Sequence, residues 1–225
     1  LPSHVPRGFK SHASPGNSMD FHPEVKYVVV FRDPEEAIVS FYPFMQQHSD
    51  EIWDLWGATS IKQRILRPTF QLWFDEVVLK DPAGVEGGMI NTCFTSFVNA
   101  WWPLRREPNV LMLHFSDMKR DHEGSVRKIA KFLDLNPGVA EWPKVLEYTS
   151  FTWMKEHEVK FEAATVCEVP ILKRGARIRK GLSGAQAEDG MTPEIAGVIR
   201  KWVDTLVSDD AARTWMYHGG LLPPL

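Results

Sequence analysis

Residues 28–44 read VVVFRDPEEAIVSFYPF, and this stretch decides the predicted fold. The continuous apolar run Tyr27–Phe31 is typical of a strand that is buried in a parallel sheet. The run breaks at Arg32, and Pro34 then suits the first position of a helix, with two glutamates in the first turn. The stretch therefore predicts a strand, a tight turn and a helix over residues 34–46.

Arg32 and Ser40 are the polar groups of interest in this unit. Arg32 stands at the carboxyl end of the strand, which is the edge of an open α/β sheet where ligands bind. Ser40 follows two turns into the predicted helix. A guanidinium fork and a hydroxyl so placed can hold a phosphate from two sides. The alternative is that Arg32 only ends a strand and Ser40 is an ordinary helix residue.

The rest of the chain adds one more clear strand and several helices. Residues 109–115 (NVLMLHF) form a second apolar run, typical of another buried strand. Periodicity and capping signals predict helices over residues 71–80, 91–106, 122–135, 139–147, 149–157 and 192–207. Less regular segments are a short strand around residues 5–10, a loop with short helices over residues 47–70, and a short Pro-rich tail. Two strands between long helical stretches indicate an α/β layer fold, and we expect a single domain over residues 1–225.

Composition excludes several classes of protein. The chain has 225 residues and a net charge of −3, which argues against nucleic-acid binding through bulk electrostatics. No apolar run has the length of a membrane span, and no Asp, Glu or His cluster has metal-ligand spacing, so we expect no membrane span and no metal. Cys93 and Cys167 favour free thiols in a reducing compartment, with one disulfide as the alternative. We therefore expect a cytoplasmic protein.

Three further segments carry chemistry. Lys10-Ser11-His12 supplies an ammonium group and a base that titrates near neutral pH, which suits removal of a proton from a hydroxyl or amine. The basic run 173–181 ends in Arg179-Lys180-Gly181. Arg179 supplies a forked guanidinium, Lys180 a compact charge, and Gly181 lets backbone N–H groups approach an anion. Residues 149–154 (TSFTWM) offer hydroxyls and a ring that can flank a nucleotide base. The simpler alternatives are a loop histidine, a solvated basic loop and a helix N-cap with a buried phenylalanine.

The order of these segments resembles that of the cytosolic-type sulfotransferases, which use 3′-phosphoadenosine 5′-phosphosulfate (PAPS). The resemblance covers about residues 5–205. It implies a three-layer, P-loop-hydrolase-like α/β fold with a central parallel sheet flanked by helices. It also implies transfer of a sulfuryl group from PAPS to a hydroxyl or amine of a small molecule, which leaves adenosine 3′,5′-bisphosphate (PAP).

The resemblance also implies roles for individual residues. His12 is the implied base, and Lys10 the group that stabilises the sulfuryl group or the bridging oxygen of the leaving phosphate. The implied cofactor-binding residues are Arg32, Ser40, Arg179, Lys180 and Gly181 at the 3′-phosphate, Arg177 in the same basic run, and Thr149, Ser150, Phe151 and Met154 beside the nucleotide. Aromatic segments 41–56 and 70–102 favour an apolar or aromatic acceptor. The sequence leaves the oligomeric state open.

Three features depart from the family pattern. Phe115 and Ser116 stand where the family has a tyrosine and a glutamate, and residues 185–187 (AQA) replace Asp-Trp-Lys. The sequence also contains no Gly/Ser/Thr-rich loop for the 5′-phosphosulfate upstream of Lys10. We expect either that the natural chain continues before Leu1 or that this is a degenerate member.

Other functions stay open at this point. The missing loop supports a non-catalytic nucleotide-binding module of sulfotransferase type. A nucleotide kinase of related fold is a third hypothesis, and the absence of Gly-x-x-x-x-Gly-Lys-Ser/Thr counts against it. A nucleic-acid-binding role would rest on residues 173–180 alone and would give steeply salt-dependent binding.

Overall fold

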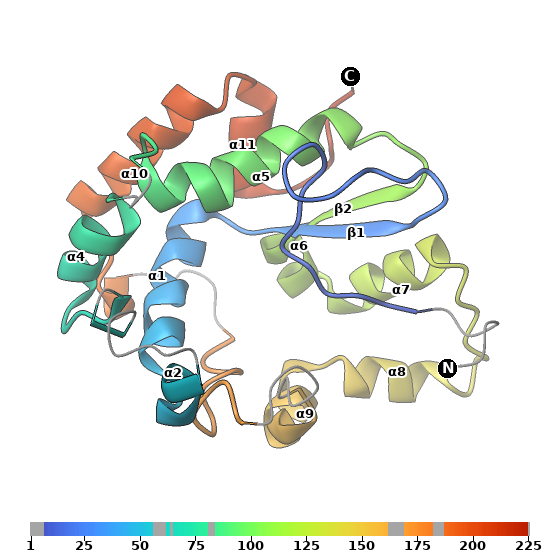
Figure 1. The fold of residues 1–225 in the computed structure, drawn as a ribbon. Helices are drawn as coiled ribbons and strands as arrows, with labels where there is room; N and C mark the ends of the chain where they lie inside the picture. The colour runs from blue at the N-terminus through green and yellow to red at the C-terminus, as the bar shows by residue number, and fades with distance from the viewer. Residues whose placement is uncertain are drawn as a thin grey trace.

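Two parallel strands lie at the centre of the molecule (Figure 1). The computed structural model describes residues 7–55, 62–63, 65–80, 84–161, 169–181 and 187–224. Within them, β1 (Tyr27–Phe31) pairs with β2 (Val110–His114) in a register that runs from Tyr27 opposite Val110 to Phe31 opposite His114. Both strands form where the apolar runs predict them.

Helices make up most of the remaining regular structure. The α-helices are α1 (Pro34–Gln46), α2 (Asp50–Leu55), α4 (Phe70–Trp73), α5 (Ser96–Trp101), α6 (Phe115–Arg120), α7 (His122–Phe132), α8 (Trp142–Tyr148), α9 (Phe151–Glu156), α10 (Pro193–Leu206) and α11 (Asp210–His218). Short π-helices span Phe74–Val78 and Ile90–Thr95, and 3₁₀ turns span Trp102–Leu104, Glu158–Phe161 and Ala187–Asp189.

The turn between β1 and α1 has a clear local cause. Asp33 caps α1, because its side chain accepts hydrogen bonds from the backbone N–H groups of Glu35 (2.8 Å) and Glu36 (3.3 Å). Pro34 occupies the first helical turn, where a missing N–H costs nothing. Burial raises the pKa of the Asp33 carboxyl. This compact turn holds Arg32 at the carboxyl end of β1.

The sheet and its helices form three layers, as an α/β fold requires. Figure 1 shows α5 and α11 on one side of the sheet and α6 and α7 on the other. Phe31 packs against Phe97 of α5 and Trp215 of α11, with ring centres 5.2 and 5.4 Å apart. The opposite face of β1 is more open, since Val28 and Val30 keep 37% and 45% of their surface exposed.

Several sequence-based predictions of elements were wrong or incomplete. The tail after α10 contains α11, because Asp209 caps a further helix and Trp215 is buried in the core. Residues 7–10, the described part of the strand expected around 5–10, have no regular structure. The segments 71–80 and 91–106 are helical, but each includes a π-helical stretch that apolar spacing does not distinguish from an α-helix.

Three further observations concern membrane spans, metal sites and cysteines. Among the described residues, no helix combines the length and apolar character needed to cross a bilayer. No group of three or more His, Cys, Asp or Glu side chains in the same ranges could hold a metal ion. Cys93 is exposed with a free thiol, and Cys167 lies outside the described residues.

Candidate functional site

A cavity of about 480 Å³ opens beyond the carboxyl end of β1. It gathers residues from six places along the chain, at residues 10–12, 32–44, 115, 151, 176–181 and 189. The site residues predicted from the sequence that line it are Lys10, His12, Arg32, Ser40, Phe151, Arg177, Arg179, Lys180 and Gly181. Segments far apart in sequence therefore meet at the sheet edge where α/β folds bind ligands.

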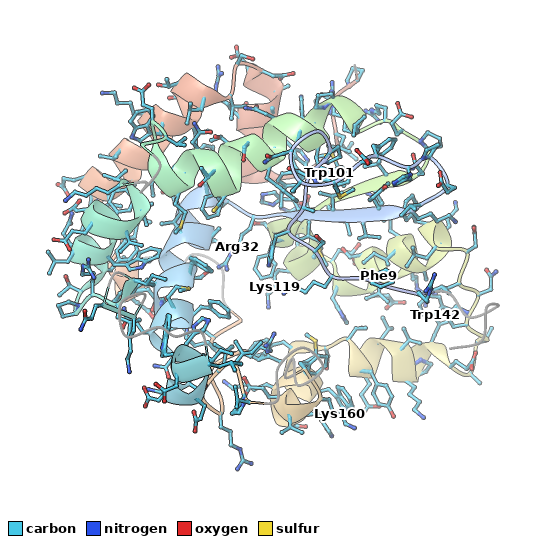
Figure 2. All side chains as sticks on the ribbon, viewed as in Figure 1. Phe9, Arg32, Trp101, Lys119, Trp142 and Lys160 are labelled. Atoms are coloured by element: carbon cyan, nitrogen blue, oxygen red, sulfur yellow. The ribbon has the colours of Figure 1, made fainter. Side chains whose placement is uncertain are left out.

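Arg32 is fixed on three sides. Its Nε donates to Glu36 Oε2 at 3.1 Å, and its Nη1 donates to Ser40 Oγ at 3.0 Å. The guanidinium carbon lies 4.8 Å from the centre of the Phe115 ring. Figure 2 shows Arg32 between the end of β1 and the start of α1. A cation oriented by a carboxylate, a hydroxyl and a ring loses little side-chain entropy when it binds an anion.

Arg179 and Lys180 share one carboxylate. Arg179 Nη1 and Nη2 donate to the two oxygens of Asp189 at 2.8 and 2.6 Å. Lys180 Nζ donates to Asp189 Oδ1 at 2.9 Å and to Glu188 Oε2 at 3.2 Å. These hydrogen bonds hold the pKa of Asp189 below its usual range and raise the pKa values of Arg179 and Lys180. All three groups are therefore charged at neutral pH.

Arg177 contributes a donor that lacks an acceptor. Glu158 Oε1 accepts hydrogen bonds from the backbone N–H groups of Arg177 (2.6 Å) and Ile178 (2.9 Å), which fixes the backbone here. The Arg177 Nε atom is buried and makes no hydrogen bond within the described residues. This donor is therefore left unsatisfied in a residue that lines the cavity.

Lys10 and His12 approach the same cavity from the amino-terminal segment. Both side chains are exposed, and the segment has no regular secondary structure. A base in this position is accessible to a small molecule that enters the cavity.

Phe151 and Gly181 are packed directly against each other. Gly181 has φ +62°, and a Cβ atom added there would lie 2.2 Å from the Phe151 ring. Two ammonium groups flank the ring, with Lys119 Nζ and Lys155 Nζ at 5.5 and 5.7 Å from its centre. The glycine therefore allows the basic segment to approach the ring that closes one side of the cavity.

Replacing Gly181 with alanine is expected to displace Phe151, and the resemblance to sulfotransferases then predicts that PAP binding weakens at least about tenfold. The strain of a positive φ alone costs roughly 1–2 kcal/mol. Gly175→Ala is the matched control, because Gly175 also has a positive φ (+84°) but no atom closer than 4.0 Å to its added Cβ. Calorimetric titration of both variants with PAP measures the difference. Equal affinities would show that the contact with Phe151 does not matter for binding.

Three predicted residues do not line the cavity: Thr149, Ser150 and Met154. Thr149 Oγ1 donates to the Val145 carbonyl at 2.9 Å and lies 3.0 Å from His122 Nε2. Ser150 caps α9 by accepting a hydrogen bond from the Trp153 N–H at 3.2 Å. The two hydroxyls thus have structural partners of their own, as the simpler alternative expects.

Sequence reasoning missed two carboxylates at this site, Glu36 beside Arg32 and Asp189 beside Arg179 and Lys180. It singled out Phe115 as a departure from the family pattern but did not predict its contact with Arg32. The four-residue interval between Arg32 and Glu36 is a sequence signal that could have predicted their ion pair. No such sequence signal predicts the contacts of Asp189 with Arg179 and Lys180, because they depend on how the folded chain returns to the basic segment.

The chain is similar in sequence to known sulfotransferases. A family model described as "Sulfotransferase domain" matches residues 2–212. Sulfotransferase 2A2 of Mus musculus is 28% identical over 165 residues, which is 73% of this chain and 50% of that protein. Sulfotransferase 2A1 of Homo sapiens is 24% identical over 177 residues, 75% of this chain and 55% of that protein. The chain thus spans about half the length of these curated relatives.

Solved structures show the same fold. Mouse sulfotransferase SULT7A1 complexed with PAP aligns with a TM-score of 0.59 at 21% identity, over 84% of this chain and 61% of that one. Retinol dehydratase in complex with androsterone and the inactive cofactor PAP aligns with a TM-score of 0.58 at 23% identity, over 82% of this chain and 48% of that one.

Proposed function

This chain belongs to the sulfotransferase domain family, and from that premise we propose that it binds PAPS and transfers the sulfuryl group to a small acceptor. The accepting group is a hydroxyl or an amine. The observation that carries the proposal is the convergence of Lys10, Arg32, Arg177, Arg179 and Lys180 on one cavity. This concentration of positive charge stands in a protein with a net charge of −3.

The cavity residues fit a nucleotide with a 3′-phosphate. Arg32 and Ser40 offer a fork and a hydroxyl, and the buried Arg177 Nε lacks an acceptor within the described residues. Phe151 offers an aromatic surface to a base. PAP is present in the solved structures of SULT7A1 and of retinol dehydratase, which supports the same ligand here.

The proposed chemistry divides the roles between His12 and Lys10. PAPS supplies an activated sulfuryl group when it is bound. The His12 imidazole accepts the proton of the acceptor's hydroxyl or amine as that group becomes the nucleophile. Lys10 places a positive charge beside the reacting centre, where it stabilises negative charge that develops on the leaving phosphate. Both side chains line the cavity that holds the basic residues.

The acceptor is proposed to be apolar or aromatic. Val39, Phe41 and Phe44 line the cavity, and the Phe41 and Phe44 rings stack with centres 5.5 Å apart. Such a surface favours contact with hydrocarbon or ring systems. Androsterone and retinol, which are bound in solved structures of retinol dehydratase, are ligands of this kind in that protein.

A non-catalytic nucleotide-binding module is the second candidate. Ion pairs and a ring contact organise Arg32, Arg179 and Lys180. By contrast, His12 is exposed, and within the described ranges its side chain makes no hydrogen bond. The binding half of the site thus has more internal contacts than the reacting half, and this difference is the observation that supports the second candidate.

Two assays test the proposal in sequence. Calorimetric titration with PAP, and with adenosine 5′-phosphate as the control, measures dependence on the 3′-phosphate. Tight binding that needs this phosphate supports the cofactor site, and equal affinities would refute it. A transfer assay with ³⁵S-labelled PAPS and a panel of steroid, retinoid and phenol acceptors then separates the two candidates. Binding without transfer to any acceptor would favour the non-catalytic module.

A further inference from the structure

Arg179 and Lys180 both donate hydrogen bonds to a carboxylate of the chain itself, that of Asp189. Both oxygens of Asp189 are engaged, one by each terminal nitrogen of the Arg179 fork, and one is shared with Lys180. Resting on the proposed function, we propose that Asp189 is an internal competitor for the 3′-phosphate, which must give up these donors before the phosphate can bind them.

Burial places Asp189 inside the site rather than at its rim. Its side chain is 15% exposed, whereas those of Arg179 and Lys180 are 33% and 32% exposed. Asp189 also lines the cavity. Glu188, the other anionic partner of Lys180, is 71% exposed and therefore faces solvent. Of the two carboxylates that hold Lys180 within the described residues, Asp189 is thus the one positioned to compete with a ligand for these donors inside the cavity.

The chemistry of the donors explains the competition. A bidentate contact between a guanidinium and a phosphate uses two parallel N–H groups, and the terminal pair of Arg179 is held by Asp189. A phosphate that shared the cations without displacing Asp189 would bring two like charges close together in a partly buried site. Binding of the dianion therefore requires Asp189 to give up these donors.

The opposite reading makes Asp189 a positioning residue that holds Arg179 in place for the phosphate. Arg32 has such a partner in Glu36, which accepts from Nε, and Nη2 makes no hydrogen bond within the described residues. Asp189 differs, because it engages both terminal nitrogens of Arg179 and Lys180 as well. The two readings predict effects of opposite sign when the charge of Asp189 is removed.

Asp189→Asn keeps the size of the side chain and removes its charge. We expect its affinity for PAP to rise about 3- to 30-fold. This range lies between the small effect of losing an exposed ion pair and the larger effect of losing hydrogen bonds to a charged group. Affinity for adenosine 5′-phosphate should stay at the wild-type level. Glu107→Gln is the matched control for net charge, because Glu107 is exposed in the turn before the amino-terminal end of β2, at the opposite edge of the sheet. Isothermal calorimetry measures all three proteins.

Weaker or unchanged PAP binding by Asp189→Asn, with Glu107→Gln like wild type, would overturn the inference. A crystal structure of the wild-type protein with PAP gives a test that does not depend on the variant's folding. Separation of Asp189 from Arg179 beyond 4 Å supports displacement, and an intact bidentate contact contradicts it.

Inorganic phosphate separates failure of this inference from failure of the proposed function. Its binding is followed by NMR through the Arg179 side-chain Nε–H signal, which is identified by its loss in Arg179→Lys. Tighter phosphate binding by Asp189→Asn, without PAP binding by either protein, would refute the nucleotide site and leave the competition standing. Equal PAP binding by wild type and Asp189→Asn would refute the competition and leave the nucleotide site standing.

Discussion

Replacing His12 with alanine is expected to lower the rate of sulfuryl transfer by about 10²–10⁴-fold, the usual contribution of a general base. Affinity for PAP should change little, because the ion pairs of Arg32, Arg179 and Lys180 do not involve His12. The substitution removes the only group proposed to take the acceptor's proton. Transfer of ³⁵S from labelled PAPS measures the rate, and calorimetry measures the affinity.

His22→Ala is the control for loss of a histidine from the same segment. His22 is exposed, and its partner within 4 Å is Glu24, at 3.6 Å. Its replacement should leave both rate and affinity unchanged. Transfer by His12→Ala at the wild-type rate would show that another group, or the solvent, takes the proton.

Replacing Arg179 with alanine is expected to weaken PAP binding by roughly 1.5–3 kcal/mol, or about 10- to 150-fold, for a lost charge-assisted contact. The loss has a second cause, since Asp189 would keep its charge beside the phosphate without its bidentate partner. Binding of adenosine 5′-phosphate should weaken much less. Calorimetric titration with the two nucleotides measures the difference.

Arg174→Ala removes the same charge from the same basic run. Arg174 is exposed and does not line the cavity, so its replacement should leave PAP binding near the wild-type level. If Arg179→Ala weakens both nucleotides equally, Arg179 does not contact the 3′-phosphate. The double substitution Arg179→Ala with Asp189→Asn should recover part of the lost affinity, because it removes the charge of the carboxylate that has lost its bidentate partner.

The strand, turn and helix around Arg32 could be read from the sequence because their causes are local. Apolar side chains on consecutive residues predict β1, and Asp33 with Pro34 predicts the start of α1. Helical geometry then sets the distance between Arg32 and Ser40, which are in hydrogen-bond contact at 3.0 Å. The helix α11 was missed although Asp209 caps it locally, and the burial of Trp215 against Phe31 and Trp102 then holds it in the core.

The sequence by itself determined the two parallel strands, most of the helices and the basic residues of the cavity. It did so because apolar periodicity, capping and motif order are properties of neighbouring residues. Only the tertiary structure decided which of those charges are paired. Asp189 and Glu158 reach the basic segment through the path of the folded chain, and no spacing rule relates them to Arg179 or Arg177. The net charge that a phosphate meets in this site is therefore a property of the fold.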